Sequence, residues 1–542
     1  MQLTRRSFMQ IAGAAAAAPF MPGCRIFTGS KTVRESRDYF CTWETQRALW
    51  KKKSSERDNM NEEVLFGDKG WARELYPDCR SGIMFTLDDG WDVPYGARNK
   101  GDGYAAFGRV APDETRFPSL KGSDVERLSG LCRRIEDEGW FGTGVWIAAQ
   151  AAGETFDRPF SRDRLQEDIK QKLETSQAAG VKYWKVDWGV HSADIWYRRM
   201  MSELARTYAP GLIVDHSRGF DNALNGVAHP YDKPRASGER MDITGITGRM
   251  IGNPDFDGVK RIYTELMSFS DSFRTYDTLG PMTSATALER AVFEIACADA
   301  TNSGCTVNVE DEPLIGAALA AGIGIMRSAI WPDPVVKEPS PKQRRLAEIA
   351  RCVAWREYAP VFGSDRGCPI VYSDEVAEEN WHYVKRSTWW SEAFDRTLFQ
   401  RAPSIVARGM KLPKVHLREE ERPMVCASRH PDTGALALAS LPMLTIARGR
   451  HTPACDIELD AELVPSVPFG VFGNIGGTIT LSAKCKGRVF ARDLLSASTV
   501  DITAKTVFEG GKAVLPGAEI AKIGSSASSD PSSPGAVVWL EA

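Results

Sequence analysis

The chain has no marked excess of one charge, no membrane-length apolar run and no closely paired cysteines. Its 68 basic and 71 acidic side chains nearly balance, and no long basic run favours nucleic acid as a partner. The apolar stretch from Ile11 to Phe20 is far shorter than the roughly 20 residues that span a bilayer, so we expect no transmembrane segment. The eleven cysteines lack the spacing of a zinc site, and most should be buried thiols. We expect no metal and no cofactor.

The amino terminus carries an export pattern. Arg5 and Arg6 stand shortly before the apolar stretch, an arrangement that resembles a twin-arginine export signal. We expect residues 1–30 to form this signal and the protein to reach the periplasm or the cell envelope. Two endings of the signal are open: a lipoprotein box in which Cys24 is acylated, or an ordinary cleavage site nearby.

The 542 residues have room for a barrel of about 250 residues or more and a second module. Between residues 31 and 402, short apolar runs alternate with helical patterns, such as the stripe that begins at the capping box of Ser123 and Glu126 and ends at Gly139. This alternation predicts parallel strands joined by helices, hence an α/β fold of the (β/α)8 barrel type. An open doubly wound sheet is the alternative, although no glycine-rich phosphate loop supports it. The eight expected strands lie at 39–42, 82–87, 142–147, 183–187, 212–216, 272–276, 305–309 and 325–330.

Two further segments differ from this pattern in composition and periodicity. The stretch from Asn222 to Ser270 is polar and poorly periodic, and we expect an inserted loop near the mouth of the barrel. From residue 403 to residue 542, short alternating runs lie between Gly, Pro, Asp and Ser turns, which predicts an antiparallel β-sandwich. Within it, the Ser-rich segment from Gly524 to Gly535 should be a flexible surface loop.

Two aspartates follow expected strands in the positions that sugar chemistry requires. Asp187 comes just past an apolar run, two residues after Lys185, and Asp277 stands three residues after Arg274. Cleavage of a glycosidic bond needs one carboxylate that attacks the sugar and one carboxylic acid that protonates the departing oxygen. Two motifs also have a purely structural interpretation. The Lys-x-Asp at residue 185 also suits a strand end, and the Asp-Asp-Gly that begins at residue 88 also suits a tight turn.

The order of several motifs resembles the retaining α-galactosidases of glycoside hydrolase clan D, the melibiases. The resemblance covers roughly residues 39–332, and the run from Arg488 to Leu495 looks like the strand of that family's C-terminal β-domain. It implies a retaining, exo-acting α-glycosidase that acts on oligosaccharides or polysaccharides. The motifs are Asp88-Asp89-Gly90-Trp91, Asp113 with Arg116-Phe117-Pro118, Gly139-Trp140 before a Gly-x-Trp-Ile strand, and Gly180-Val181 leading to Lys185-x-Asp187.

The resemblance also implies a role for individual residues. Asp187 matches the nucleophile and Asp277 the general acid/base, although the spacing from Arg274 is one residue shorter than is frequent in the family. Asp271 and Asp299 are the alternative acids. The implied substrate-binding residues are Trp43, Asp88, Asp89, Trp146, Lys185, Asp215, His216, Arg274 and Asp311.

The region that reads the 2-substituent of the sugar departs from the α-galactosidase pattern. Asp215 or His216 occupies that place, so an α-N-acetylgalactosaminide or a β-L-arabinopyranoside is an alternative substrate. Near Asp311, the flanking Glu310 and Glu312 are expected in an exposed acidic turn. A carbohydrate-binding protein on a degenerate barrel is the non-enzymatic alternative, and an exported redox enzyme has no supporting motif. The sequence does not define an oligomeric state.

Overall fold

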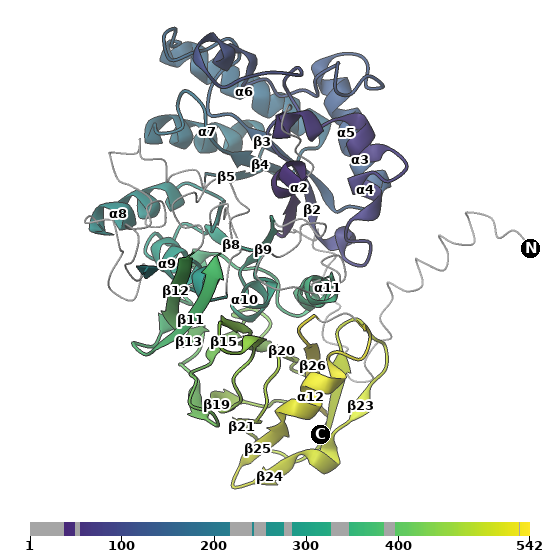
Figure 1. The fold of residues 1–542 in the computed structure, drawn as a ribbon, viewed down its shortest axis with the longest axis vertical. Helices are drawn as coiled ribbons and strands as arrows, with labels where there is room; N and C mark the ends of the chain where they lie inside the picture. Colours follow the sequence, from purple (N-terminus) through teal and green to yellow (C-terminus); the bar gives the residue numbers. More distant parts are fainter. Residues whose placement is uncertain are drawn as a thin grey trace, which may run out of the picture.

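A closed barrel of eight parallel strands organises the first two thirds of the chain (Figure 1). The structure is a computed structural model that describes residues 37–48, 55–216, 241–242, 256–275, 284–326, 346–383, 396–529 and 532–541. The first strand pairs with both the second and the last, which closes the barrel and rules out the open sheet. The strands, in barrel order, are β1 (Tyr39–Cys41), β2 (Met84–Leu87), β3 (Gly142–Ile147), β4 (Tyr183–Val186), β5 (Ile213–Asp215), β7 (Ser272–Arg274), β8 (Thr306–Glu310) and β9 (Gly322–Ile325).

The predicted strands are confirmed except the last, since β9 ends where the expected range begins. Helix α5 begins with the predicted capping box of Ser123 and Glu126. Part of the expected inserted loop is instead helix α8, and residues 222–240 and 243–255 lie outside the described residues. No helix in the described ranges is long and apolar enough to cross a membrane. The helices of this part are α2 (Trp43–Ala48), α3 (Glu62–Phe66), α4 (Trp71–Glu74), α5 (Asp124–Asp137), α6 (Arg162–Ala179), α7 (Ile195–Tyr208), α8 (Phe256–Met267), α9 (Ser284–Asp299), α10 (Pro313–Ala318) and α11 (Leu346–Ala354).

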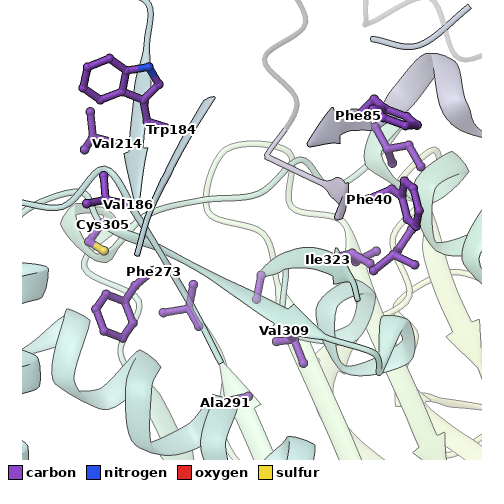
Figure 2. Close-up of a cluster of buried hydrophobic side chains, with 14 of the residues drawn as sticks. Phe40, Phe85, Trp184, Val186, Val214, Phe273, Ala291, Cys305, Val309 and Ile323 are labelled. Carbon is purple, nitrogen blue, oxygen red and sulfur yellow. The ribbon is translucent and has the colours of Figure 1, made fainter. Parts of the chain in front are cut away.

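The two faces of the barrel wall differ in chemistry. Side chains alternate along each strand, so every second residue faces the surrounding helices. Figure 2 shows this outer set, which includes Phe40, Phe85 and Trp184 and belongs to the main apolar core. The inward set holds a small apolar cluster around Tyr39 and Tyr183 together with charged side chains. The interior of the barrel is therefore polar enough to hold a reactive site.

The C-terminal part is a sandwich of two sheets that share a core of side chains such as Leu438 and Ile479. The sheets are mixed and not purely antiparallel as predicted, because β13–β15, β16–β20 and β19–β21 are parallel pairs. One sheet has the order β10-β13-β15-β16-β20-β26-β22-β23 and the other β14-β19-β21-β25-β24, while a third, β18-β17-β11-β12-β6, packs against α9. The boundary at residue 403 stays a prediction, although β10 already belongs to the first sheet.

The elements of these sheets have the following bounds: β6 (Met241–Asp242), β10 (Ile370–Tyr372), β11 (Val376–Tyr383), β12 (Arg396–Pro403), β13 (Ile405–Arg408), β14 (Lys414–Leu417), β15 (Met424–Arg429), β16 (Leu436–Leu441), β17 (Met443–Thr445), β18 (Gly449–His451), β19 (Cys455–Glu462), β20 (Phe469–Phe472), β21 (Thr478–Ser482), β22 (Arg488–Asp493), β23 (Val500–Asp501), β24 (Val507–Glu509), β25 (Lys512–Pro516), α12 (Gly517–Ile523) and β26 (Gly535–Glu541).

A buried ion pair connects barrel and sandwich. Arg351 on α11 contacts Asp493 at the end of β22 with two N–O distances of 3.0 and 2.9 Å. The Ser-rich segment joins the same interface, since the Ser533 amide donates to Glu348 at 3.1 Å and Ser532 is buried. The expectation of a surface loop is therefore wrong for this end of the segment. The ten cysteines among the described residues are all free thiols, and eight of them are buried, as expected.

Candidate active site

The carboxyl ends of β2 and β4 bring a lysine and two aspartates together. Lys185 faces inward from β4 and places its Nζ 2.5 Å from Oδ2 of Asp88. The Cys41 thiol of β1 donates to the same oxygen at 2.9 Å, and the Asp89 amide donates to the other oxygen of Asp88 at 2.7 Å. All of these side chains are nearly inaccessible to solvent. The Asp-Asp-Gly motif therefore forms a turn and a charged site at once.

Asp187 lies one residue past β4 and is only 5% exposed. The indole N–H of Trp146, on the adjacent β3, donates to its Oδ2 at 2.9 Å. Arg198 of α7 donates to the backbone carbonyl of Asp187 at 2.8 Å, which fixes the chain at this point. Because Lys185 and Asp187 are two residues apart in an extended segment, both belong to the same face of the barrel wall. Asp187 is thus an oriented carboxylate close to a buried cation.

Asp89 is engaged by an arginine that sequence analysis missed. Arg57 makes a bidentate contact, with Nε 2.8 Å from Oδ1 and Nη2 2.7 Å from Oδ2. Its guanidinium also lies 5.2 Å from the ring centre of Phe107 and 5.4 Å from that of Trp188. Burial raises the pKa of the Asp89 carboxyl, and the arginine acts against that rise. Asp89 therefore holds Arg57 over the aromatic rings of the site.

A second charged network occupies the barrel interior between β5, β7 and β8. Arg274 places Nη1 2.9 Å from Oδ1 of Asp215 and Nε 3.7 Å from Oε1 of Glu310. The Tyr183 hydroxyl donates to Asp215, and the Tyr39 hydroxyl donates to Glu310 at 2.8 Å. Burial raises the pKa of both tyrosines well above the ordinary value, so they stay protonated donors. The predicted exposure of Glu310 is wrong, because the alternation of β8 turns it inward.

Asp311 and Trp43 also follow barrel strands at their carboxyl ends. Asp311 follows β8 with a φ of 58°, and its Oδ1 accepts a hydrogen bond of 3.1 Å from the Met326 amide. Glu312 accepts one of 2.9 Å from the Ser284 hydroxyl and is buried, so the predicted exposed turn is wrong here too. Trp43 begins α2 and packs, half-buried, on the inner apolar cluster.

Three predicted residues lie elsewhere. His216 faces outward, where its Nε2 is 2.8 Å from the Ser202 hydroxyl of α7, and burial lowers its pKa well below the ordinary value. Asp271 precedes β7, so it belongs to the opposite, amino end of that strand, and it accepts from the Val214 amide at 2.9 Å. Asp299 ends α9 outside the barrel. Neither alternative acid therefore lies at the carboxyl end of a barrel strand. Asp277 is outside the described residues.

A histidine bridge connects the loops after β3 and β4. His191 has Nε2 3.0 Å from Oε1 of Glu154 and Nδ1 2.7 Å from Oδ2 of Asp194. Burial alone would lower the pKa of the ring, but these two carboxylates outweigh it and raise the pKa. No sequence pattern predicts this bridge, since Glu154 comes from the loop after β3 and the other two residues from the loop after β4. Among the described residues, no group of three or more side chains is arranged to hold a metal ion.

No family model matches the chain, and no curated protein matches it. Solved structures with a similar fold include α-galactosidase I from Mortierella vinacea, at 11% identity over 88% of this chain and 96% of that chain, with a TM-score of 0.36. A GH27 β-L-arabinopyranosidase from Geobacillus stearothermophilus matches at 10% identity over 93% and 94%, with a TM-score of 0.38. An α-galactosidase from Saccharomyces cerevisiae matches at 8% identity over 93% and 98%, with a TM-score of 0.36.

Proposed function

We propose that this chain is a retaining, exo-acting α-glycosidase, with terminal α-galactosides as its first candidate substrates. The observation that carries the proposal is the Asp187 carboxylate, held by the Trp146 indole beside the buried Lys185–Asp88 pair. This arrangement lies at the carboxyl end of a closed (β/α)8 barrel, where such barrels carry their chemistry. The clustered carboxylates and the cation suit the recognition of sugar hydroxyls.

In the proposed reaction, one Asp187 oxygen forms a bond to the anomeric carbon of the terminal sugar while the bond to the leaving oxygen breaks. Asp277 gives its proton to that oxygen, so the aglycone departs as a neutral alcohol. In the second step Asp277 takes a proton from water, the water oxygen attacks the anomeric carbon, and Asp187 leaves as a carboxylate. Lys185 stabilises the negative charge of Asp187 and Asp88 and, with Asp88, binds hydroxyl groups of the sugar.

The barrel topology supports an acid from β7. Thr275, the last described residue before Asp277, directly follows this strand at its carboxyl end, and its hydroxyl accepts from the Glu310 amide at 2.9 Å. Strands β4 and β7 are separated by β5 alone, so their backbones are about 10 Å apart at a strand spacing of about 4.8 Å. For a retaining mechanism the Asp187 and Asp277 carboxyl groups would need to be about 5 to 5.5 Å apart, and we propose that separation for them.

The decisive experiment measures hydrolysis of aryl α-glycosides by the wild type and by Asp187→Ala and Asp277→Ala. The sugar panel contains α-galactoside, α-N-acetylgalactosaminide and β-L-arabinopyranoside, and the sugar that is cleaved identifies the substrate class. Asp299→Asn is the matched control, because it removes an aspartate charge outside the barrel and keeps an oxygen that can accept from the Ile370 amide. We expect both alanine variants to lose activity and the control to keep it.

Added azide separates the two roles. In Asp187→Ala the anion can enter the space of the lost carboxylate and attack directly, which gives a glycosyl azide of inverted configuration. In Asp277→Ala it attacks the covalent intermediate from the other side, which gives a product of retained configuration. The same azide product from both variants would overturn the assignment. A folded wild type that binds sugars but cleaves none would establish the carbohydrate-binding alternative instead.

Export and lipid attachment are also proposals, because residues 1–36 lie outside the described part of the chain. Fractionation of cells that produce the wild type and Arg5→Lys/Arg6→Lys tests the twin-arginine route, since the double variant should stay in the cytoplasm. Mass spectrometry of the mature amino terminus decides between an acylated Cys24 and an ordinary cleavage site.

A further inference from the structure

A continuous series of aromatic rings leads away from Asp187 toward solvent. The series begins at Trp146, which contacts Asp187, and continues to Trp188 with ring centres 4.9 Å apart. Trp188 lies 6.0 Å from Tyr104 with the rings at 84°, and Tyr104 lies 4.9 Å from Phe156 with the rings at 86°. Each contact is within the range of favourable aromatic pairs. The rings come from four separate parts of the chain, which meet at the carboxyl end of the barrel.

Exposure rises along the series. Trp146 is fully buried, Trp188 and Tyr104 are half-buried, and 58% of Phe156 is exposed. Phe156 is the most exposed of these rings. The series therefore begins at the proposed nucleophile and ends at the protein surface.

The loop that carries Phe156 is braced on both sides. Thr155 and Arg158 form an isolated β-bridge, so Phe156 lies at the tip of a tight turn. Before the turn, the buried Glu154 accepts hydrogen bonds from the Phe160 and Ala151 amides at 2.8 and 3.1 Å. The exposed ring is thus held in a fixed place before anything binds to it.

The same turn is tied to the segment of Tyr104. Arg158 donates to Asp102 at 2.8 Å, and Asp102 belongs to the short 3-10 helix Gly101–Ala106 that contains Tyr104. This ion pair is exposed and therefore weak, so the two outer rings are positioned relative to each other mainly by their own contact and by the braced turn. Rings held in this way bind a ligand with little loss of conformational freedom.

We propose that Trp188, Tyr104 and Phe156 form a binding track for the sugar units that follow the terminal one in an α-linked oligosaccharide. This inference rests on the proposed function, because it assigns the chain beyond the sugar that Asp187 attacks. The C–H faces of pyranose rings pack on aromatic side chains, while their hydroxyl groups remain in water at the exposed end. The increase in exposure along the track suits a chain that leaves the barrel. The substrate class is then an oligosaccharide of at least three units and not a simple disaccharide.

The test compares Phe156→Ala and Tyr104→Ala with the wild type on substrates of increasing length. An α-glycosyl fluoride places one sugar at Asp187 and nothing on the track, whereas di-, tri- and tetrasaccharides with the same terminal sugar extend along it. We expect kcat/KM for the fluoride to stay unchanged and kcat/KM for the trisaccharide and tetrasaccharide to fall about 5- to 10-fold in each variant. Phe156→Trp should restore the wild-type value, since any flat ring serves the track.

Tyr372→Ala is the matched control, because Tyr372 is a 40% exposed aromatic residue of β10 in the C-terminal sheets. This variant should leave kcat/KM unchanged for every substrate. An equal loss on the fluoride and on the oligosaccharides would overturn the track and indicate a general distortion. Unchanged kcat/KM for every length would overturn it as well.

The proposed function can fail separately from the track. If the wild type does not cleave the fluoride, the glycosidase assignment is wrong, and calorimetric titration of the same oligosaccharides then decides the inference. Tighter binding with each added sugar unit in the wild type, lost in Phe156→Ala, would support the track on a binding protein. Affinity that is independent of length would overturn it.

Discussion

Replacing Trp146 by phenylalanine should slow the second half of the proposed reaction more than the first. The indole N–H that donates to Oδ2 of Asp187 stabilises this oxygen most when it carries negative charge. Asp187 is a carboxylate in the free enzyme and a neutral ester in the covalent intermediate. Its charge falls during glycosylation and returns during deglycosylation, so loss of the donor raises the barrier of the second step.

The magnitude follows from the hydrogen bond itself. A bond to a charged group contributes about 1.5–3 kcal/mol and one to a neutral group about 0.5–1.5 kcal/mol. The difference between carboxylate and ester is therefore about 1–1.5 kcal/mol, which corresponds to about a 5- to 13-fold slower hydrolysis of the intermediate at full charge development. The entry into the intermediate should not be slowed, because the free carboxylate loses at least as much stabilisation as the transition state, in which its charge is already falling.

A stopped-flow assay with a dinitrophenyl α-glycoside resolves the two steps. We expect Trp146→Phe to release a burst of dinitrophenolate close to the enzyme concentration, followed by a slow steady rate. Trp184→Phe is the matched control, because Trp184 is also fully buried, on the adjacent strand, and donates its indole N–H at 3.0 Å to Ser176 outside the barrel. Both variants should lose about 1–3 kcal/mol of unfolding free energy, which urea unfolding measures.

Three results would refute the reasoning. The first is an unchanged steady rate in Trp146→Phe, and the second is an equal effect of Trp184→Phe, which would make the loss structural. The third is a fall in kcat/KM of about a hundredfold or more without a burst, because a single hydrogen bond to a carboxylate is too weak to cause it in that step.

Other parts of the molecule give further tests. Lys185→Met leaves Asp88 buried without its cation and should lower the unfolding free energy by about 3–5 kcal/mol in urea, while Lys185→Met/Asp88→Asn should recover part of that loss. Arg351→Met should lower the unfolding free energy by a similar amount, because it leaves Asp493 buried without its cation, and adding Asp493→Asn should recover part of that loss. Additive losses in the double variant would contradict a direct ion pair. The two carboxylate partners of His191 raise its pKa in the folded protein. The stability that this bridge contributes is therefore fully present below the pKa of the unfolded chain, about 6.5, and is lost as the pH rises through the folded pKa. A melting-temperature series from about pH 5 to 9 should therefore fall less steeply in His191→Gln than in the wild type.

Much of the site could be predicted because the end of a buried strand can be recognised in a sequence as an apolar run followed by polar residues. Lys185 and Asp187 follow an apolar run with the spacing of two that puts both on one face of the wall. The same rule explains an error, since His216 is one residue from Asp215 and therefore faces α7 instead of the interior. A position off by one residue changes the side of the sheet entirely.

Other errors came from judging residues by their immediate neighbours. The Glu-Asp-Glu triplet at Glu310 has the composition of an exposed turn, but the alternation of β8 directs this residue inward. Its partner Tyr39 is 271 positions away, and no local pattern reveals that the first and seventh strands are separated only by β9, over whose Gly324 the two side chains meet. Arg57 was missed for the same reason, because its partner Asp89 lies on a different loop.

The interior charges affect how variants of Arg274 can be interpreted. Its guanidinium lies between the carboxylates of Asp215 and Glu310, all three fully buried, and the tyrosines nearby donate hydrogen bonds without adding charge. Removal of the arginine alone leaves two buried anions facing each other, which costs several kcal/mol whether or not a sugar contacts that side chain. An inactive Arg274→Met is therefore no proof of a role in binding. Arg274→Met combined with Asp215→Asn and Glu310→Gln removes the three charges together, and Asp215→Asn alone is its necessary control, because Asp215 is itself a candidate sugar-binding residue.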